Sequence, residues 1–209
     1  MRRPPSASIT RLAMYSRFLE EYMIVKGAQS TINSQQLANF LDINPHQIRK
    51  DLSYFGKFGK RGLGYRVKEL YEEINRILGL QRSWNMCLCG LGNLGSALAV
   101  YNGFRRMHLN IVAIFDNDPK KIGTKVGDIV VSHPRFIQQK VKRLNIEIAI
   151  ITVPQASAQS IANSLVDAGI RAILNFAPVR LNAPSYVKLR NVDLATELVS
   201  LTHFLTYFK

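Results

Sequence analysis

Residues 86–116, MCLCGLGNLGSALAVYNGFRRMHLNIVAIFD, decide the fold of this chain. They contain an apolar run at 86–89, a glycine turn at 90–95, a helical pattern, a second apolar run at 110–115 and a closing acid, Asp116. Short, continuous apolar runs are typical of strands buried on both faces of a parallel sheet. The order strand, turn, helix, strand therefore predicts a doubly wound α/β domain of the Rossmann type.

The glycine turn predicts that this domain binds a dinucleotide. It reads Gly90-Leu91-Gly92-Asn93-Leu94-Gly95, and a helix is predicted from about Asn93 to Tyr101. In this motif the first glycine permits the tight turn, the second lets the backbone approach a pyrophosphate, and the third lets the helix pack against the strand. The helix N-terminus would direct free N–H groups at the phosphates. A glycine-rich turn in an α/β domain that binds no nucleotide is the alternative.

The acid at the end of the second strand predicts which dinucleotide is bound. Asp116 lies 21 residues after Gly95. A carboxylate at this place accepts the ribose hydroxyls of an adenosine and repels a 2′-phosphate. The sequence therefore favours NAD(H) over NADP(H), although Lys120 and Lys121 lie close enough to weaken that exclusion.

Composition restricts the class of protein. The chain has 209 residues, 47% of them hydrophobic, and a formal net charge of +14. That length allows one or two domains, and the charge favours a polyanionic partner. No apolar run approaches the roughly 20 residues of a membrane span, and no apolar segment of a signal peptide follows the N-terminus. We therefore expect a cytoplasmic protein without a membrane partner.

The two cysteines, Cys87 and Cys89, lie on one predicted strand and point to the same face. They form no disulfide framework, which agrees with a reducing compartment. We expect two small core residues, and a thiol redox switch is the alternative.

The first eighty residues predict a winged helix-turn-helix. A helix is predicted at 9–25, a short one opens at the capping box Asn33 to Gln36, and another opens at Asn44-Pro45. Residues 56–65 alternate glycine and apolar residues, which predicts a β-hairpin wing. Between Arg49 and Lys68 there are seven basic residues against a single acid.

We expect this unit to bind DNA, with the helix reaching base edges and the wing reaching phosphates. A basic helical subdomain that binds nothing is the alternative. The candidate contacts are His46, Gln47, Arg49, Lys50, Ser53, Tyr54, Lys57, Lys60 and Arg61.

The remainder of the chain continues the α/β alternation. A helix is predicted at 67–80, strands at 129–131, 146–153 and 172–174, helices at 134–144 and 155–168, a further strand at 187–193, and a terminal helix at 195–208. The sequence predicts a DNA-binding domain at 1–84, a nucleotide domain at 85–192 and a C-terminal helix at 193–209. The apolar stripe of that helix suggests an oligomer contact, with core packing in one subunit as the alternative.

Two segments at the carboxyl ends of predicted strands are candidates for the nicotinamide half of the pocket. Loop packing alone is the alternative for both. They contain Thr152, Val153 and Pro154, and Asn175, Phe176 and Ala177.

These features together resemble the Rex family of redox-sensing transcriptional repressors over nearly the whole chain. The segments that carry the likeness are 47–56, 59–65, 90–95, 152–154, 173–178 and 192–194. The resemblance implies a homodimer with a C-terminal helix swapped onto the partner subunit. It also implies binding to palindromic, double-stranded operator DNA and release when NADH binds. By motif position it implies a switch formed by Arg11, Tyr101 and Asp193 of the partner subunit.

Two other classes of protein were weighed against this one. An NAD-dependent dehydrogenase would need a substrate domain and a His/carboxylate pair, and the sequence predicts neither, so we expect no enzyme. A regulator that reads CoA or an adenine nucleotide on the same fold is the second alternative.

The charge of the nicotinamide ring gives a physical reason for a response to NADH. NADH is neutral at its ring and NAD⁺ is cationic there, so a dry apolar pocket would favour NADH.

Overall fold

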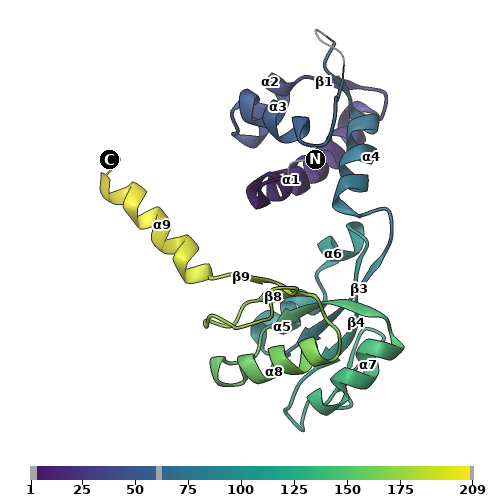
Figure 1. Cartoon of the computed structure of the whole chain (residues 1–209), viewed down its shortest axis with the longest axis vertical. Helices are drawn as coiled ribbons and strands as arrows, with labels where there is room; N and C mark the ends of the chain where they lie inside the picture. The colour runs from purple at the N-terminus through teal and green to yellow at the C-terminus, as the bar shows by residue number, and fades with distance from the viewer. Residues whose placement is uncertain (1–3, 60–62, 208–209) are drawn as a thin grey trace. The chain divides into compact units, whose positions relative to one another are not determined.

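The computed structural model describes residues 4–59 and 63–207 and divides the chain into two compact units, Met1–Arg82 and Ser83–Lys209 (Figure 1). The first unit has one hydrophobic core and the second has two, one on each face of its sheet. Among the described residues, no helix combines the length and the apolar character needed to cross a membrane.

The first unit is a small helical domain with a two-stranded sheet. Its elements are α1 (Ser6–Lys26), β1 (Thr31–Ile32), α2 (Ser34–Leu41), α3 (Pro45–Ser53), β2 (Tyr65–Arg66) and α4 (Val67–Leu78). Leu12, Leu37, Ile48 and Ile74, one from each helix, are fully buried in its core. The helix-turn-helix is confirmed, since the Asn33–Gln36 capping box starts α2 and Asn44 caps α3.

The predicted wing is corrected in one respect. Residues 56–59 form no strand, and β2 pairs in an antiparallel way with β1, Tyr65 opposite Ile32, rather than within a hairpin. Gly59 and Gly64 nevertheless lie close together, because a Cβ built on Gly59 would lie 2.3 Å from the Gly64 carbonyl oxygen. Two-residue strands leave no alternation for a sequence pattern to detect.

The second unit is built on a seven-stranded sheet. Its elements are β3 (Trp84–Cys89), α5 (Asn93–Ala99), α6 (Asn102–Arg106), β4 (Leu109–Phe115), β5 (Lys125–Val126), β6 (Ile129–Ser132), the 3₁₀ helix η1 (Pro134–Phe136), α7 (Ile137–Arg143), β7 (Ile146–Ile151), α8 (Gln155–Asp167), β8 (Ala172–Asn175), β9 (Lys188–Asn191) and α9 (Leu194–Tyr207).

The sheet confirms the doubly wound α/β prediction. Its order is β5-β6-β4-β3-β7-β8-β9, and every pair is parallel except β5 with β6. Helices α5 and α6, which carry Leu98 and Phe104, cover the face of the sheet on which Leu88 lies. Helices α7 and α8 cover the opposite face, on which Cys87 lies. Because the chain leaves β3 toward one edge and β7 toward the other, the loops after these strands diverge and leave a crevice for a ligand.

Two element boundaries differ from the sequence prediction. The helix after the glycine turn ends at Ala99, and a second short helix, α6, starts after Tyr101. The backbone of Tyr101 is extended (φ −72°, ψ 107°), which separates the two helices. Pro134 starts a 3₁₀ turn, and the α-helix proper begins only at Ile137.

Candidate functional site

A cavity of about 560 Å³ lies at the carboxyl ends of the central strands of the second unit. Its volume lies within the range of small-molecule sites. It is lined by Cys89, Gly90, Gly92, Leu94, Phe115, Asp116, Asn117, Asp118, Lys121, Pro134, Thr152, Val153, Pro154, Ser157, Ile161, Phe176, Ala177 and Pro178. The glycine turn, the acid after β4 and the loops after β7 and β8 therefore share one hollow.

Backbone hydrogen bonds fix the loops around this cavity. The first N–H of each loop donates to the last carbonyl of a neighbouring strand, at 2.8 Å in all three cases: Gly90 to Phe115, Thr152 to Cys89 and Phe176 to Ile151. The rim of the cavity thus continues the hydrogen-bond ladder of the sheet, which makes it a rigid edge rather than a set of free loops.

The three glycines of the turn differ in what an added side chain would contact. Gly90 has φ +101°, and a Cβ there would lie 2.8 Å from the Thr152 carbonyl carbon. A Cβ on Gly95 would lie 2.0 Å from the Gly90 carbonyl oxygen, so this glycine permits the close packing of α5. A Cβ on Gly92 would meet no atom within 4 Å. Packing against the described residues therefore does not require glycine at 92, the N-cap of α5, and this fits a ligand that approaches the backbone there.

Asp116 holds the glycine turn. Its Oδ2 accepts the backbone N–H of Leu91 at 2.6 Å and the Lys121 Nζ at 3.3 Å, and its Oδ1 accepts the backbone N–H of Asp118 at 2.8 Å. Burial opposes ionisation of this carboxyl, but the two backbone hydrogen bonds and Lys121 outweigh it and lower its pKa. Asp116 is therefore an anion at the wall of the cavity, and Lys121 lies directly beside it.

Two of the predicted ligand residues are tied into the protein. The Thr152 hydroxyl lies 2.8 Å from the Gly90 carbonyl oxygen and 3.1 Å from that of Cys89. Asn175 is fully buried, and its amide donates to the carbonyls of Ala177 and Val179 and accepts the Ala177 N–H. The side chain of Asn175 thus folds the loop that carries Phe176 and Ala177 into the cavity wall.

The cavity contains most of the residues that the sequence singled out. Gly90, Gly92, Leu94, Asp116, Thr152, Val153, Pro154, Phe176 and Ala177 line it, whereas Leu91, Asn93, Gly95 and Asn175 do not. Sequence reasoning missed Ser157 and Pro178. Ser157 lies in the first turn of α8, directly after the Pro154 that begins this helix, and that helix start was the available signal.

The two cysteines are packed in the core, as expected. Cys87 and Cys89 are both fully buried and free. A hydrogen bond with Cys87, together with burial, raises the pKa of the Cys89 thiol. A raised pKa lowers the thiolate fraction, so the structure favours two packing residues over a reactive thiol pair.

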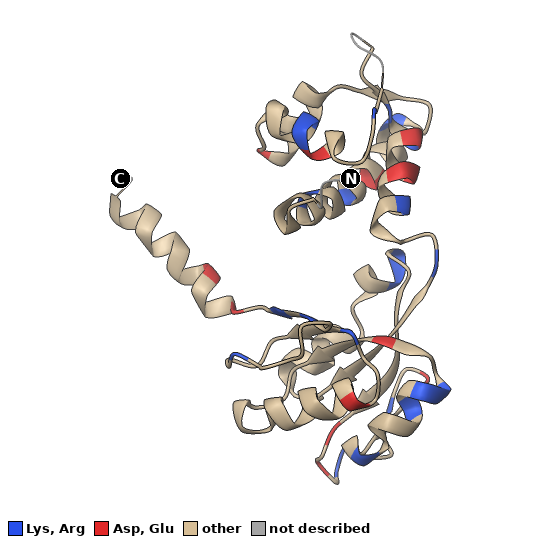
Figure 2. Ribbon diagram, in the orientation of Figure 1, with Lys and Arg blue, Asp and Glu red and all other residues tan. Residues whose placement is uncertain are grey.

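The basic residues of α3 are exposed on one face. His46, Arg49 and Lys50 are all exposed. Figure 2 marks the lysine and arginine positions of the chain in blue. Arg49 Nη1 donates to Ser34 Oγ at the start of α2, at 2.8 Å. Ser53 donates its hydroxyl to the Lys50 carbonyl oxygen, so only its acceptor capacity remains free.

The other predicted DNA contacts have mixed positions. Gln47 is half-buried, and its Nε2 donates to Asp51 at 2.9 Å. Tyr54 is half-buried and Lys57 is exposed. Lys60 and Arg61 lie outside the described residues.

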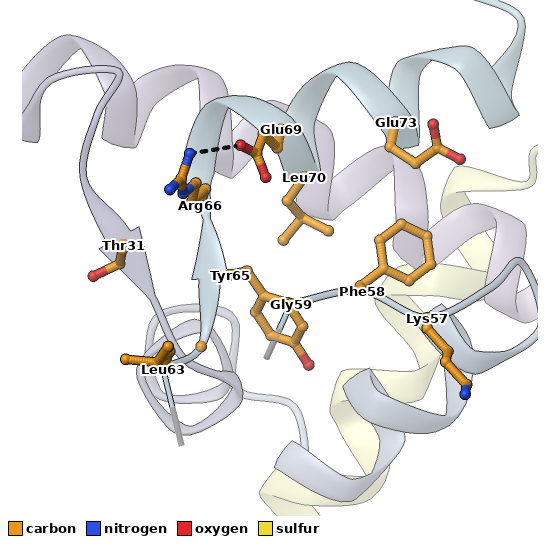
Figure 3. Close-up of a pocket in the computed structure, with 11 residues that line it drawn as sticks. Thr31, Lys57, Phe58, Gly59, Leu63, Tyr65, Arg66, Glu69, Leu70 and Glu73 are labelled. Atoms are coloured by element: carbon orange, nitrogen blue, oxygen red, sulfur yellow. Dashed lines mark hydrogen bonds and ion pairs between the residues drawn. The ribbon is translucent and has the colours of Figure 1, made fainter. Parts of the chain in front are cut away.

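A second hollow, of about 730 Å³, lies beside the wing segment within the first unit (Figure 3). Phe58 and Tyr65 line it on one side, and Leu70 lies on α4 between Glu69 and Glu73. Arg66 is paired with Glu69 at 3.1 Å. Lys57 and Arg66 are matched by the two carboxylates in this lining, so the hollow carries no excess of positive charge for a phosphate backbone.

The three residues of the implied switch each have local partners. Arg11 binds Asp51 at 2.6 Å within the first unit. Tyr101 is half exposed and packs edge-on against Phe104. Asp193 accepts the N–H groups of Ala195 and Thr196 at the start of α9. The link between these three residues across subunits stays a prediction.

Comparison with known proteins covers both units. Residues 5–53 match a family model described as a putative DNA-binding protein N-terminus, and residues 81–179 match one described as a CoA binding domain. Two relatives named redox-sensing transcriptional repressor Rex are similar over 198 residues. The one from Desulfitobacterium hafniense is 50% identical (95% of this chain, 93% of the relative), and the one from Carboxydothermus hydrogenoformans is 48% identical (95% and 94%).

Solved structures give the same result. One is a crystal structure of the repressor RSP with β-NAD⁺ and operator DNA. Its sequence is 38% identical to this chain, the TM-score is 0.90, and the match covers 98% of this chain and 94% of the RSP chain. A structure of RSP with β-NADH is 36% identical, with a TM-score of 0.87 and coverage of 98% and 95%. RSP is described as a Rex-family repressor. The chain therefore belongs to the Rex family of redox-sensing transcriptional repressors.

Proposed function

We propose that this protein represses transcription by binding palindromic, double-stranded operator DNA as a homodimer, and that NADH releases it. The relatives and the neighbouring structures with β-NAD⁺, β-NADH and operator DNA support this proposal. The observation that carries it is the open space at Gly92, beside a glycine turn that is held by Asp116.

The residues present fit a dinucleotide. Gly92 lies where a pyrophosphate would approach the backbone, and Asp116 lies where an adenosine ribose would be recognised. We place the nicotinamide half against the loops after β7 and β8, where Val153, Phe176 and Ala177 offer an apolar wall. When bound, NADH supplies a neutral ring to that wall, and NAD⁺ supplies a cation whose desolvation costs free energy.

A dimer is proposed from α9. None of its described residues is buried, and its exposed apolar residues are Leu194, Leu198, Val199, Leu201, Phe204, Leu205 and Tyr207. An apolar helix of this kind needs a partner surface. We propose that segment 193–209, which follows the DNA-binding domain 1–84 and the nucleotide domain 85–192, is swapped onto the partner subunit. We further propose that Arg11, Tyr101 and the partner's Asp193 form the switch.

Release would follow from differential binding. A ligand changes the operator affinity only by as much as its own affinity differs between the two dimer states, and reciprocity requires DNA to weaken NADH binding equally. A change from 1:99 to 99:1 needs about 5.5 kcal/mol of difference. We propose a cytoplasmic protein, where DNA and NADH meet, and we assign no catalysis to it.

A titration of DNA binding tests this function. The protein is bound to a palindromic duplex selected from a random library at fixed salt, and NADH, NAD⁺, CoA and ADP are added separately. The proposal expects NADH to release the duplex and NAD⁺ to leave it bound. Release by CoA or ADP alone would favour a regulator of another ligand, which the relatives do not support.

A further inference from the structure

Asp51 is a fully buried carboxylate on α3, the helix that the proposed function assigns to the DNA groove. It accepts five hydrogen bonds, four of them from three residues of α1. The donors are Arg11 Nε at 2.6 Å, Arg11 Nη2 at 2.7 Å, the Ser8 hydroxyl at 2.8 Å, the Tyr15 hydroxyl at 2.8 Å and Gln47 Nε2 at 2.9 Å.

Such a group is a poor way to gain stability. Burying an ion pair costs desolvation, and well-packed apolar residues often stabilise a core as much or more. What the network does supply is geometry, since bonds of fixed length from Ser8, Arg11 and Tyr15 set the rotation and axial position of α3 against α1. A helix inserted into a DNA groove needs that position to be fixed.

The fifth bond fixes the orientation of Gln47. An ionised carboxylate only accepts hydrogen bonds, so the Nε2 end of the amide must face Asp51. Burial opposes ionisation of Asp51, but the bonds from Arg11, Tyr15, Ser8 and Gln47 outweigh it and lower its pKa. The Oε1 atom and the second N–H of Gln47 have no side-chain or backbone partner in the part of the chain that the structure describes. An acceptor and a donor therefore remain available on one half-buried side chain.

Adenine is the base that matches this pair. In the major groove it offers the N7 acceptor and the N6 donor, and glutamine recognises both together. Gln47 lies in the first turn of α3, and residues at the N-terminus of a recognition helix contact base edges. Arg49 and Lys50 carry donors only, which suits phosphates or guanine.

We propose that Asp51 is the positioning residue of the recognition helix, and that through its bond to Gln47 it sets this amide to read one adenine in each operator half-site. The inference rests on the proposed binding of operator DNA by α3 and adds the base and the residue pair that reads it.

The test uses the full-length protein and single-atom changes in DNA. A preferred duplex is selected from a random library, and each adenine is then replaced in turn by 7-deazaadenine, which lacks N7. For the wild type, one position per half-site should weaken binding by about tenfold, the size of one good base contact. In Gln47→Ala that position should lose its sensitivity while the other positions keep theirs. Gln35→Ala, an exposed glutamine on α2, should keep all of them.

Asp51→Asn tests the positioning step. Its side-chain amide can donate to Gln47 Oε1 and turn the glutamine over, so the same adenine should lose its effect while binding to unrelated DNA is kept. Thermal unfolding shows whether this variant folds, and Gln47→Ala decides the question by itself if it does not. A wild type that selects no duplex contradicts operator binding and this inference together. An operator whose adenines respond alike in wild type and Gln47→Ala contradicts this inference alone, and the Asp51–Gln47 bond is then only structural.

Discussion

Asp116, the acid that ends β4, accepts the backbone N–H of Leu91 through Oδ2 at 2.6 Å, so it holds the glycine turn that follows β3. The side chain expected to read the ribose thus also fixes the loop expected to hold the pyrophosphate. Lys121 lies 3.3 Å from the same oxygen and 3.9 Å from Asp118 Oδ2, so one cation faces two carboxylates at the expected ribose end. Recognition of the ribose and the position of the glycine turn therefore both depend on the Asp116 carboxylate.

Replacing Asp116 should alter both affinity and selectivity. In Asp116→Asn the charge is lost and Lys121 keeps only its 3.9 Å ion pair with Asp118. NADH affinity should therefore fall about tenfold, and NADPH should lose less or gain. Fluorescence titration with both nucleotides measures this. Asp128→Asn removes an exposed carboxylate of the same unit and should change neither constant. An unchanged ratio of NADPH to NADH affinity in Asp116→Asn would remove this residue from the ribose site.

Two glycines of the turn make a matched pair. Gly95→Ala places a Cβ 2.0 Å from the Gly90 carbonyl oxygen, so the free energy of unfolding should fall by about 2 kcal/mol or more. Gly92→Ala meets no atom within 4 Å, so its stability should stay within about 0.5 kcal/mol of the wild type. Urea unfolding without nucleotide separates the two variants. Equal destabilisation by both would contradict the assignment of the space at Gly92 to a ligand.

Asn175 should act on the ligand through the loop it folds. Asn175→Ala leaves the Val179 carbonyl without its donor and the Ala177 N–H without its acceptor. This costs about 1–3 kcal/mol of stability and loosens Phe176. NADH should then bind more weakly than to the wild type at a temperature where both proteins are folded. Asn182, an exposed residue whose backbone N–H bonds to Gln159, is the control position for an alanine substitution. Full NADH affinity in Asn175→Ala would show that the loop needs no such support.

Asp51 makes stability depend on acid pH. Its pKa in the folded protein lies below its ordinary value of 3.8, so folding is stabilised above that value and the stabilisation is lost as the pH falls through the folded pKa. The free energy of unfolding should therefore decrease from pH 5 toward pH 2. In Asp51→Asn it should already be lower by about 3 kcal/mol at pH 7, and the two curves should converge in acid. Parallel curves over this range would contradict the buried network.

The α/β unit was largely predictable because its signals are local. Continuous apolar runs gave the strands, and the glycine spacing and Asp116 gave the crevice between them. The pairing of Tyr65 with Ile32 was not predictable, since it joins two-residue strands 33 residues apart. Gln47 was predicted as a DNA contact, but its bond to Asp51 was not predictable from the sequence. A buried charge and its donors come from distant segments, which no single pattern records.

The most direct test joins the cavity to the repressor function. The affinity for the selected palindromic duplex is measured at fixed salt, without and with saturating NADH, for the wild type and for Gly92→Ala. The Cβ added in this variant meets no atom within 4 Å, so we expect it to fold as the wild type does. We predict that NADH weakens duplex binding by the wild type at least about tenfold, the size of a typical allosteric coupling, and leaves Gly92→Ala bound. Release of both proteins by the same NADH concentration would contradict the assignment of this cavity as the redox sensor.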